Sequence, residues 1–311
     1  MEVILAIDGG ATHTRCAAID RSGRLLTQAE GGPSNHLQDG EKNACATLAE
    51  LVQQTLQQAN LGRQEVECIS AGLAGVDYDG YGAGPIQDLF QGLGFERCLI
   101  HGDMEIAHAA ALGGGPGIVV LAGTGSSILG VDASGRRVKV GGWGPLYGNE
   151  GSAQKISERA LTAAARAYDG REPSTALLES LTKALDLSDF RNSISFLYGP
   201  DARNIASLCE IVYQCAVSGD EVACSIFEDA ASELAQGVMA AACRLGLHNS
   251  PVVVSYQGGV AEHCPLLVRS MRQRLAEVLP DACVRPPLWK PVIGAYLLAC
   301  NVIGWKAAVQ P

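Results

Sequence analysis

Two short glycine-rich turns carry the residues of this chain that are best suited to bind a phosphate group. They are Asp8-Gly9-Gly10-Ala11-Thr12 and Gly123-Thr124-Gly125-Ser126. Glycines let the backbone approach an anion closely and point consecutive N–H groups at it. A carboxylate such as Asp8 can also bind Mg²⁺ through water. One such turn is most often only a hairpin, but two together predict a site that holds a nucleoside triphosphate.

Neither turn belongs to the two commonest nucleotide-binding motifs. The spacing GxxxxGK[ST] of the Walker loop is absent from both. Neither turn opens the strand-to-helix crossover of a Rossmann site. A different nucleotide-binding fold is therefore expected.

The elements around the two turns repeat. Each turn follows an apolar run and precedes a second apolar run, a Ser-Gly turn and a third run, and the motif Asp-x-Ser-Gly-Arg occurs at 20–24 and again at 132–136. This order predicts a three-stranded antiparallel meander in each half of the chain. An internal duplication explains the match, and two unrelated hairpins are the alternative.

The pattern of the remaining residues indicates alternating helices and strands. We expect helices at 41–59, 151–167, 203–246 and 294–304, and strands at 68–71, 98–100 and 251–257. A chain of 311 residues can form two cores. The pattern predicts an α/β fold with an N-terminal lobe of residues 1–112, joined by a C-terminal helix in 294–311, and a C-terminal lobe of residues 113–293.

Composition narrows the class of protein. Hydrophobic residues make up 47% and the net charge is −10, which argues for a well-packed chain and against nucleic acid as the main partner. The eleven cysteines are odd in number and never spaced as CxxC, so neither zinc nor a disulfide framework is indicated. Without a leader segment or an apolar run of about 20 residues, we expect a cytoplasmic protein with no membrane partner.

Several motifs, taken in order, resemble one family. They are Asp8 to Thr12, Ser34-Asn35-His36, Gly102-Asp103, Leu121 to Ser126, Gly141-Gly142-Trp143-Gly144, Gly148-Asn149-Glu150-Gly151-Ser152 and Gly258-Gly259-Val260. The chain resembles the N-acetylglucosamine kinase branch of the BadF/BadG/BcrA/BcrD-type ATPase family, within the superfamily of hexokinases, actin and heat-shock ATPases. The resemblance covers nearly the whole chain.

The resemblance implies a ribonuclease-H-like, actin-like ATPase fold in each lobe, with ATP and Mg²⁺ in a cleft between the lobes. By this analogy Thr12 and Thr124 meet the phosphates, while Ser207 and the turn Gly258-Gly259 lie near adenosine. The family often has glycine at the position of Ser207. A homodimer is also implied, as is an ATP-dependent kinase that converts N-acetylglucosamine to its 6-phosphate.

Asp103 is the candidate catalytic base. Phosphoryl transfer to a hydroxyl needs in-line positioning, charge neutralisation and often a carboxylate that accepts the proton. Asp103 follows the expected strand 98–100 and begins an alanine-rich helix, where a carboxylate can point into a cleft. The residues alone favour a helix N-cap, and the resemblance favours the base.

The expected substrate ligands lie in three loops. They are Asn35, His36, Gly142, Trp143, Gly144, Asn149 and Glu150. An Asn amide offers a donor and an acceptor to a sugar hydroxyl. The family usually has aspartate where this chain has Asn149, so a charge-assisted bond becomes an ordinary one and free glucosamine becomes a less attractive substrate.

Three other functions remain open. The chain could be a glucosamine or other aminosugar kinase. It could be an ATPase that activates a partner enzyme, as family members with a cysteine-bound iron–sulfur cluster do, although no close cysteine pair is evident in the sequence. It could also be a sugar-sensing regulator, although the sequence leaves no room for a helix-turn-helix before the first strand.

Overall fold

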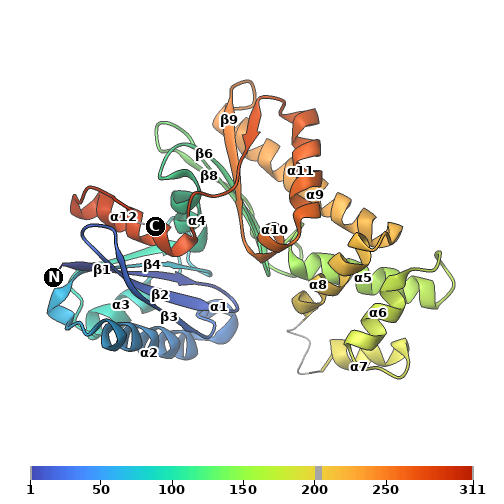
Figure 1. The fold of residues 1–311 in the computed structure, drawn as a ribbon, viewed down its shortest axis with the longest axis horizontal. Helices are drawn as coiled ribbons and strands as arrows, with labels where there is room; N and C mark the ends of the chain where they lie inside the picture. The colour runs from blue at the N-terminus through green and yellow to red at the C-terminus, as the bar shows by residue number, and fades with distance from the viewer. Residues whose placement is uncertain (1, 200–204, 310–311) are drawn as a thin grey trace. The chain divides into compact units, whose positions relative to one another are not determined.

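The structure is a computed structural model, and it describes residues 2–199 and 205–309. It divides into two units: the first comprises Met1–Val119 and Pro286–Pro311, and the second comprises Val120–Arg285. The sequence placed these boundaries at 112 and 293. The C-terminal helix α12 (Pro291–Ile303) belongs to the first unit, as Figure 1 shows, and residues 310 and 311 of the expected helical segment lie outside the described residues.

A five-stranded mixed sheet forms the centre of the first unit, in the order β3-β2-β1-β4-β5. Its strands are β1 (Val3–Gly9), β2 (Thr14–Asp20), β3 (Leu25–Gly31), β4 (Val66–Leu73) and β5 (Cys98–Gly102). The pairs β1–β2 and β2–β3 are antiparallel, whereas β4 runs parallel to β1 and β5 parallel to β4. The predicted meander in the first half is therefore confirmed.

Helices cover both faces of this sheet because its central strand is apolar on both sides. They are α1 (His36–Asp39), α2 (Glu41–Ala59), the short η1 (Arg63–Glu65), α3 (Gly84–Gly92), α4 (Asp103–Leu112) and α12. On β1, Leu5 and Ile7 join the core formed with α2 and α3, while Ile4 and Ala6 join the core formed with α4 and α12. This alternation follows from the two-residue period of a strand.

The second unit contains another five-stranded sheet, in the order β10-β9-β6-β7-β8. Its strands are β6 (Gly117–Ala122), β7 (Ser126–Val131), β8 (Arg137–Gly141), β9 (Val252–Gln257) and β10 (Ala282–Val284). The pair β7–β8 is antiparallel and β9–β10 is parallel. Read from β8, the order repeats that of the first sheet strand for strand, which confirms the internal duplication.

Helices of the second unit follow its meander. They are α5 (Ala153–Tyr168), α6 (Ala176–Ala184), η2 (Phe190–Asn192), α7 (Ser193–Leu197), α8 (Cys209–Val217), α9 (Glu221–Leu245), α10 (Gly259–His263) and α11 (Pro265–Val278). Residues 203 and 204 of the expected helical stretch lie outside the described residues. Helix α9 packs against β7 and β8, and α11 packs against α9. At Gly237 a Cβ would stand 2.3 Å from the Ile128 side chain, so this glycine lets α9 approach the sheet.

The repeated motif folds the same way in both units. The carboxylate of Asp20 accepts hydrogen bonds from the Ser22 amide, the Ser22 hydroxyl and the Arg24 amide. Asp132 accepts the same three bonds from Ser134 and Arg136. Burial raises the pKa of Asp20, but these bonds outweigh it and the pKa lies below the usual aspartate value. The two halves of the chain therefore share individual side-chain hydrogen bonds as well as their strand order.

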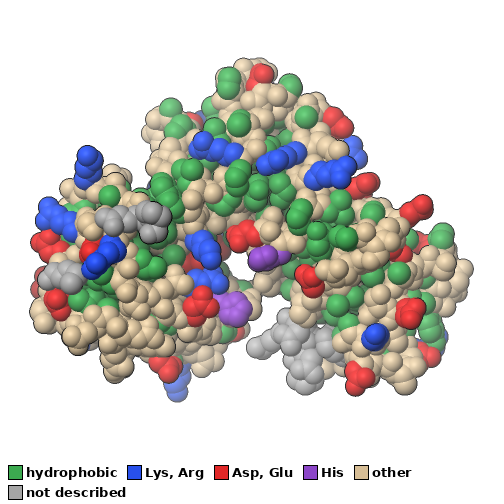
Figure 2. All heavy atoms as spheres, viewed as in Figure 1, with side chains coloured by type: hydrophobic (Ala, Val, Ile, Leu, Met, Phe, Trp, Pro, Cys, Tyr) green, Lys and Arg blue, Asp and Glu red, His purple; other side chains and the backbone are tan. Residues whose placement is uncertain are grey.

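Charged side chains of both signs are interspersed within each unit on the face drawn in Figure 2. Among residues 2–199 and 205–309, no helix is both long enough and apolar enough to cross a membrane.

Candidate functional site

The carboxyl ends of three parallel strands in the first unit bring two of the predicted sites together. Gly9 at the end of β1 lies opposite Leu73 at the end of β4, and Leu73 lies opposite Gly102 at the end of β5. The turn Asp8 to Thr12 and the carboxylate of Asp103 therefore leave the sheet at the same edge. This edge is where open α/β sheets bind ligands.

The turn after β1 is held by close packing that only glycine permits. A Cβ on Gly9 would stand 2.3 Å from the Ser34 hydroxyl and 2.4 Å from a Leu73 methyl group. The Ser34 amide donates to the Gly10 carbonyl (3.1 Å), and the buried Thr14 hydroxyl donates to the Ser34 hydroxyl (2.8 Å). These contacts fix the loop of Ser34 against the turn.

Asp8 is the residue that the sequence predicts to bind a hydrated cation. It lies at the end of β1, and its side chain is 18% exposed. Mg²⁺ in proteins usually keeps several waters and one or two carboxylates, which suits a partly exposed carboxylate at a strand end. Arg15 lies 3.9 Å from the Asp8 carboxylate and binds Glu30 at 2.8 Å, which lowers the pKa of Glu30. Sequence reasoning missed Arg15, although it is the cross-strand partner of Asp8.

Asn35 and His36 begin α1 beside two glycines. The side-chain oxygen of Asn35 accepts from the Leu37 amide (3.1 Å), so Asn35 is the N-cap of this helix. A Cβ on Gly75 would stand 2.7 Å from that same oxygen, and a Cβ on Gly82 would stand 2.9 Å from the His36 ring. The His36 Nδ1 atom is buried without a hydrogen-bond partner in the structure.

The loop after β4 links Asn35 to Asp103. Gly75 packs against Asn35, and a Cβ on Gly102 would stand 2.8 Å from the carbonyl oxygen of the next residue, Val76. Asn35 and Asp103 therefore lie on either side of one short backbone segment. The structure brings together the predicted phosphate turn, the predicted sugar ligand Asn35 and the predicted base within the first unit.

The interpretation of Asp103 as a helix N-cap is wrong. The N-cap of α4 is Gly102, whose amide donates to the Glu105 carboxylate at 2.9 Å. Glu105 thus caps the first turn, as in a capping box. Asp103 is the first residue of the helix, half-buried, and one of its oxygens accepts from the Met104 amide at 2.8 Å.

In the second unit, the glycine loop after β6 is bound to the start of α5. The carbonyl of Gly123 accepts from the Ala153 amide at 2.9 Å. The Ser126 hydroxyl donates to the Glu150 carbonyl at 2.6 Å, and Ser152 is the N-cap of α5. The loop 123–126 and the loop 148–152 therefore form one interlocked structure.

Asn149 is part of this interlock. Its backbone has φ 64°, a left-handed conformation that asparagine tolerates better than most residues. Its side chain is 8% exposed, and its oxygen accepts from the Ser126 amide at 3.4 Å. The sequence predicted a sugar ligand here; the structure shows Asn149 supporting the glycine loop.

The turn Gly258-Gly259 lies against the same glycine loop. A Cβ on Gly123 would stand 3.9 Å from the Gly258 Cα and from the Gly259 amide nitrogen. Ser207 is exposed and lies two residues before Cys209, whose thiol is hydrogen-bonded to Cys264, the residue after α10. The glycine loop 123–126 and the turn Gly258-Gly259 of the predicted nucleotide site therefore lie side by side in the second unit.

A cavity of about 360 Å³ lies beside the loop that carries Trp143. Of the predicted substrate ligands, Trp143 and Glu150 line it. Trp143 is 66% exposed and stacks on Tyr147, with ring centroids 6.4 Å apart. Ser126, from the predicted phosphate turn, also lines the cavity, whereas sequence reasoning missed three other polar lining residues: Ser127, Glu233 and Gln236. The last two lie on α9, far along the chain from Trp143, and no local signal points to them.

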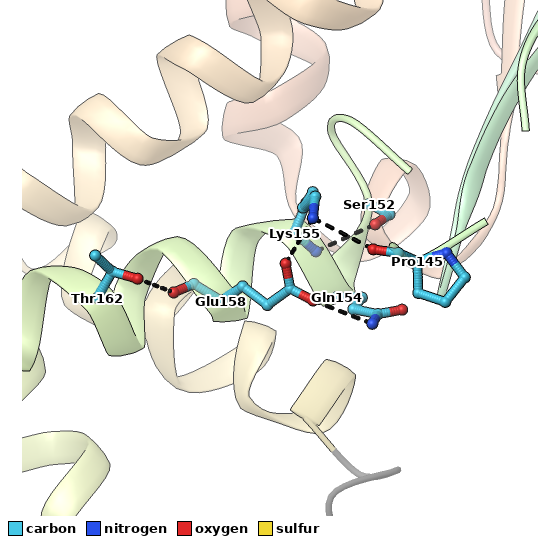
Figure 3. A network of polar contacts seen from close by, with 6 residues as sticks. All are labelled: Pro145, Ser152, Gln154, Lys155, Glu158 and Thr162. Carbon is cyan, nitrogen blue, oxygen red and sulfur yellow. Dashed lines mark hydrogen bonds and ion pairs between the residues drawn. The ribbon is translucent and has the colours of Figure 1, made fainter. Parts of the chain in front are cut away.

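A polar network fixes the loop of Trp143 to α5 (Figure 3). The Lys155 ammonium donates to the Pro145 carbonyl at 3.3 Å and binds the Glu158 carboxylate at 2.8 Å. Gln154 donates to the same carboxylate at 3.1 Å. Because these contacts come from one face of a sixteen-residue helix, they hold the cavity wall in place.

Comparison with known proteins shows the family to which the chain belongs. The model of the BadF/BadG/BcrA/BcrD ATPase family matches residues 5–299. The chain belongs to this family. It is 31% identical over 304 residues to an N-acetylmuramic acid/N-acetylglucosamine kinase of Clostridium acetobutylicum, covering 96% of this chain and 98% of the relative. It is 30% identical over 315 residues to an N-acetyl-D-glucosamine kinase of Dictyostelium discoideum, with the same coverage.

A solved structure agrees with the fold of this family member. The crystal structure of a candidate N-acetylglucosamine kinase from Chromobacterium violaceum has a TM-score of 0.79 and 26% identity, and the match covers 96% of this chain and 98% of that one. The α/β fold with two similar lobes, as predicted from the sequence, is confirmed. The roles of the individual site residues stay predictions.

The structure contains a cysteine pair that the sequence did not predict. The thiols of Cys209 and Cys264 share a hydrogen bond that raises the pKa of Cys209 and lowers that of Cys264. Both side chains are buried. Among residues 2–199 and 205–309, no group of three or more His, Cys, Asp or Glu side chains could hold a metal.

Replacing Gly258 by alanine is expected to lower the free energy of unfolding by about 2 kcal/mol and to weaken ATP binding. Gly258 has φ 100°, and its Cβ would stand 2.6 Å from the Ala122 carbonyl oxygen. Gly259→Ala is the matched control for stability, because a Cβ there has no neighbour within 4 Å. Urea unfolding and ATP titration measure both effects, and equal stability of the two variants would contradict the packing described here.

Proposed function

We propose that this chain is an ATP-dependent kinase that phosphorylates a hydroxyl of an amino sugar, with N-acetylglucosamine as the substrate and its 6-phosphate as the product. The observation that carries the proposal is the shared strand edge in the first unit, where the Asp8 turn and the Asp103 carboxylate leave adjacent parallel strands. The names of the two kinases that are 30–31% identical over nearly their whole length support the substrate class.

In this proposal the residues of the first unit bind the sugar and accept the proton of its hydroxyl. Asp103 accepts the proton of the hydroxyl as it attacks, and the Met104 amide holds one of its oxygens in place. Asn35 uses its oxygen to cap α1, so its amide nitrogen is the group that donates to a sugar oxygen. His36 packs beside it and contributes to the wall of the sugar site.

In the same proposal the glycine loops bind the phosphates of ATP. Backbone amides at 9–12 and 123–125 bind phosphate oxygens, Thr12 and Thr124 add hydroxyl contacts, and Gly258, Gly259 and Ser207 border adenosine. Asp8 would hold Mg²⁺ through water. When bound, the metal neutralises phosphate charge. Gly142, Trp143, Gly144, Asn149 and Glu150 are the proposed sugar ligands of the second unit.

Three further properties belong to the proposal. Mg²⁺ is the metal, because Asp8 offers a partly exposed carboxylate of the kind that binds a hydrated magnesium ion. A cytoplasmic location fits eleven cysteines that are all free thiols, since disulfides are rare in that compartment. A homodimer is implied by family resemblance, and light scattering on the purified protein would measure it.

A panel of sugars assayed with ATP and Mg²⁺ by coupled ADP release tests the function. We expect turnover with N-acetylglucosamine that exceeds turnover with glucosamine, because Asn149 lacks the charge that would attract an ammonium group. Preferred use of glucosamine would instead favour the alternative aminosugar kinase. ADP release that no sugar stimulates, together with iron and sulfide in anaerobically purified protein, would favour the partner-activating ATPase.

A further inference from the structure

One buried hydroxyl in the cavity beside Trp143 lacks a partner. Ser127, on β7, is 8% exposed, lines the cavity, and its Oγ atom has no hydrogen-bond partner in the structure. Gly142 keeps this hydroxyl accessible, because a Cβ there would stand 2.9 Å from it. A buried polar group left without a bond is costly, so this hydroxyl indicates a polar ligand group in the cavity.

The charged residues that line the cavity are both carboxylates. They are Glu150, in the loop before α5, and Glu233, on α9. Among residues 2–199 and 205–309, neither carboxylate forms a hydrogen bond or an ion pair. A ligand group in this cavity therefore meets two negatively charged lining side chains and no positively charged one.

The nearby cations are already engaged or lie outside the cavity. Lys155 and Arg159 line a smaller adjoining cavity that shares Glu150 and Glu233, but Lys155 binds Glu158 at 2.8 Å and Arg159 binds Asp229 at 2.9 Å. Lys139 has its Cε atom 3.2 Å from where a Gly142 Cβ would stand, and it does not line the cavity.

We propose that Glu233 determines acceptor specificity: with Glu150 it makes this cavity accept uncharged sugar substituents and reject sugars that carry a carboxylate. The inference rests on the proposed function, because it takes the cavity as part of the sugar site. Glu233 is half-buried and Glu150 is exposed, and like charges brought close together repel each other. The Clostridium acetobutylicum relative is named a kinase of both N-acetylmuramic acid and N-acetylglucosamine. Under this inference the present chain accepts the second sugar and rejects the first.

The test compares N-acetylglucosamine with N-acetylmuramic acid, which adds a lactyl ether and its carboxylate to the same sugar. The measured quantity is the ratio of kcat/KM for the acid to kcat/KM for N-acetylglucosamine. In the wild type this ratio is expected to be low and to rise with salt, because salt screens charge repulsion. The methyl ester of N-acetylmuramic acid, which has the bulk without the charge, is expected to react faster than the acid.

Glu233→Gln is expected to raise this ratio about tenfold and to weaken its salt dependence. Glu228→Gln is the matched control, because Glu228 is an exposed glutamate on the same helix that does not line the cavity. The control should keep the wild-type ratio. A change in fold alone would not raise the relative use of the acid and at the same time flatten its salt dependence.

Equal use of both sugars by the wild type would overturn the inference, as would an ester that reacts no faster than the acid or an unchanged ratio in Glu233→Gln. If neither sugar is phosphorylated, calorimetric titration with the same sugars separates the two proposals. Charge-dependent binding would then retain the inference while the kinase proposal fails. Absence of binding by N-acetylglucosamine would overturn the inference as well.

Discussion

Replacing Asp103 by asparagine is expected to lower kcat with N-acetylglucosamine by about 10³-fold while ATP still binds. An amide has nearly the size of the carboxylate but cannot take up the proton of the acceptor hydroxyl. The asparagine oxygen can still accept from the Met104 amide, and Glu105 still caps α4, so the helix start should stay intact. Coupled ADP release measures turnover, and titration with ATP measures binding.

Asp88→Asn is the matched control for this variant. Asp88 is an exposed aspartate on α3, in the same unit, and removing its charge should leave turnover as in the wild type. Turnover of Asp103→Asn within a few-fold of the wild type with any amino sugar would exclude Asp103 as the base. Loss of ATP binding as well would instead point to a disturbed first unit.

Replacing Gly294 by alanine is expected to lower the free energy of unfolding by about 3 kcal/mol or more. Alanine favours a helix over glycine by about 1 kcal/mol, so propensity alone predicts a more stable protein. At this position in α12, however, a Cβ would stand 1.8 Å from the Ile106 carbonyl oxygen and 2.9 Å from the Ala110 amide nitrogen. Both are backbone atoms of α4, so the two helices must separate.

Gly92→Ala is the matched control, because a Cβ at this end of α3 has no neighbour within 4 Å. Its stability should stay within about 0.5 kcal/mol of the wild type in urea unfolding. Turnover is a second readout: α4 begins at Asp103, so a displaced α4 in Gly294→Ala should also slow the reaction. A Gly294→Ala protein as stable as Gly92→Ala would show that α4 and α12 do not pack as described.

Local patterns were sufficient to predict the parts of the fold that depend on neighbouring residues. The helix at 41–59 has the predicted bounds, because its apolar spacing and the left-handed Asn60 that ends it are both local. The two meanders and their aspartate turns were also predicted, since each turn is bonded within five residues.

Features that depend on contacts between distant segments could not be predicted. Glu233 reaches the cavity because α9 packs on β7 and β8, and nothing near residue 233 in the sequence indicates this. The Cys209–Cys264 pair likewise forms only when α8 meets the end of α10. Asp103 was weighed as an N-cap because aspartate is common there, whereas Gly102 and Glu105 share that role. Arg15 could have been found from its strand pairing with Asp8.

The most direct test of the kinase proposal is ³¹P NMR of the purified protein incubated with ATP, Mg²⁺ and N-acetylglucosamine. We predict that one sugar 6-phosphate resonance grows in step with ADP, and that neither appears at a comparable rate without the sugar. Formation of ADP and inorganic phosphate alone, independent of the sugar, would contradict phosphoryl transfer to a sugar hydroxyl.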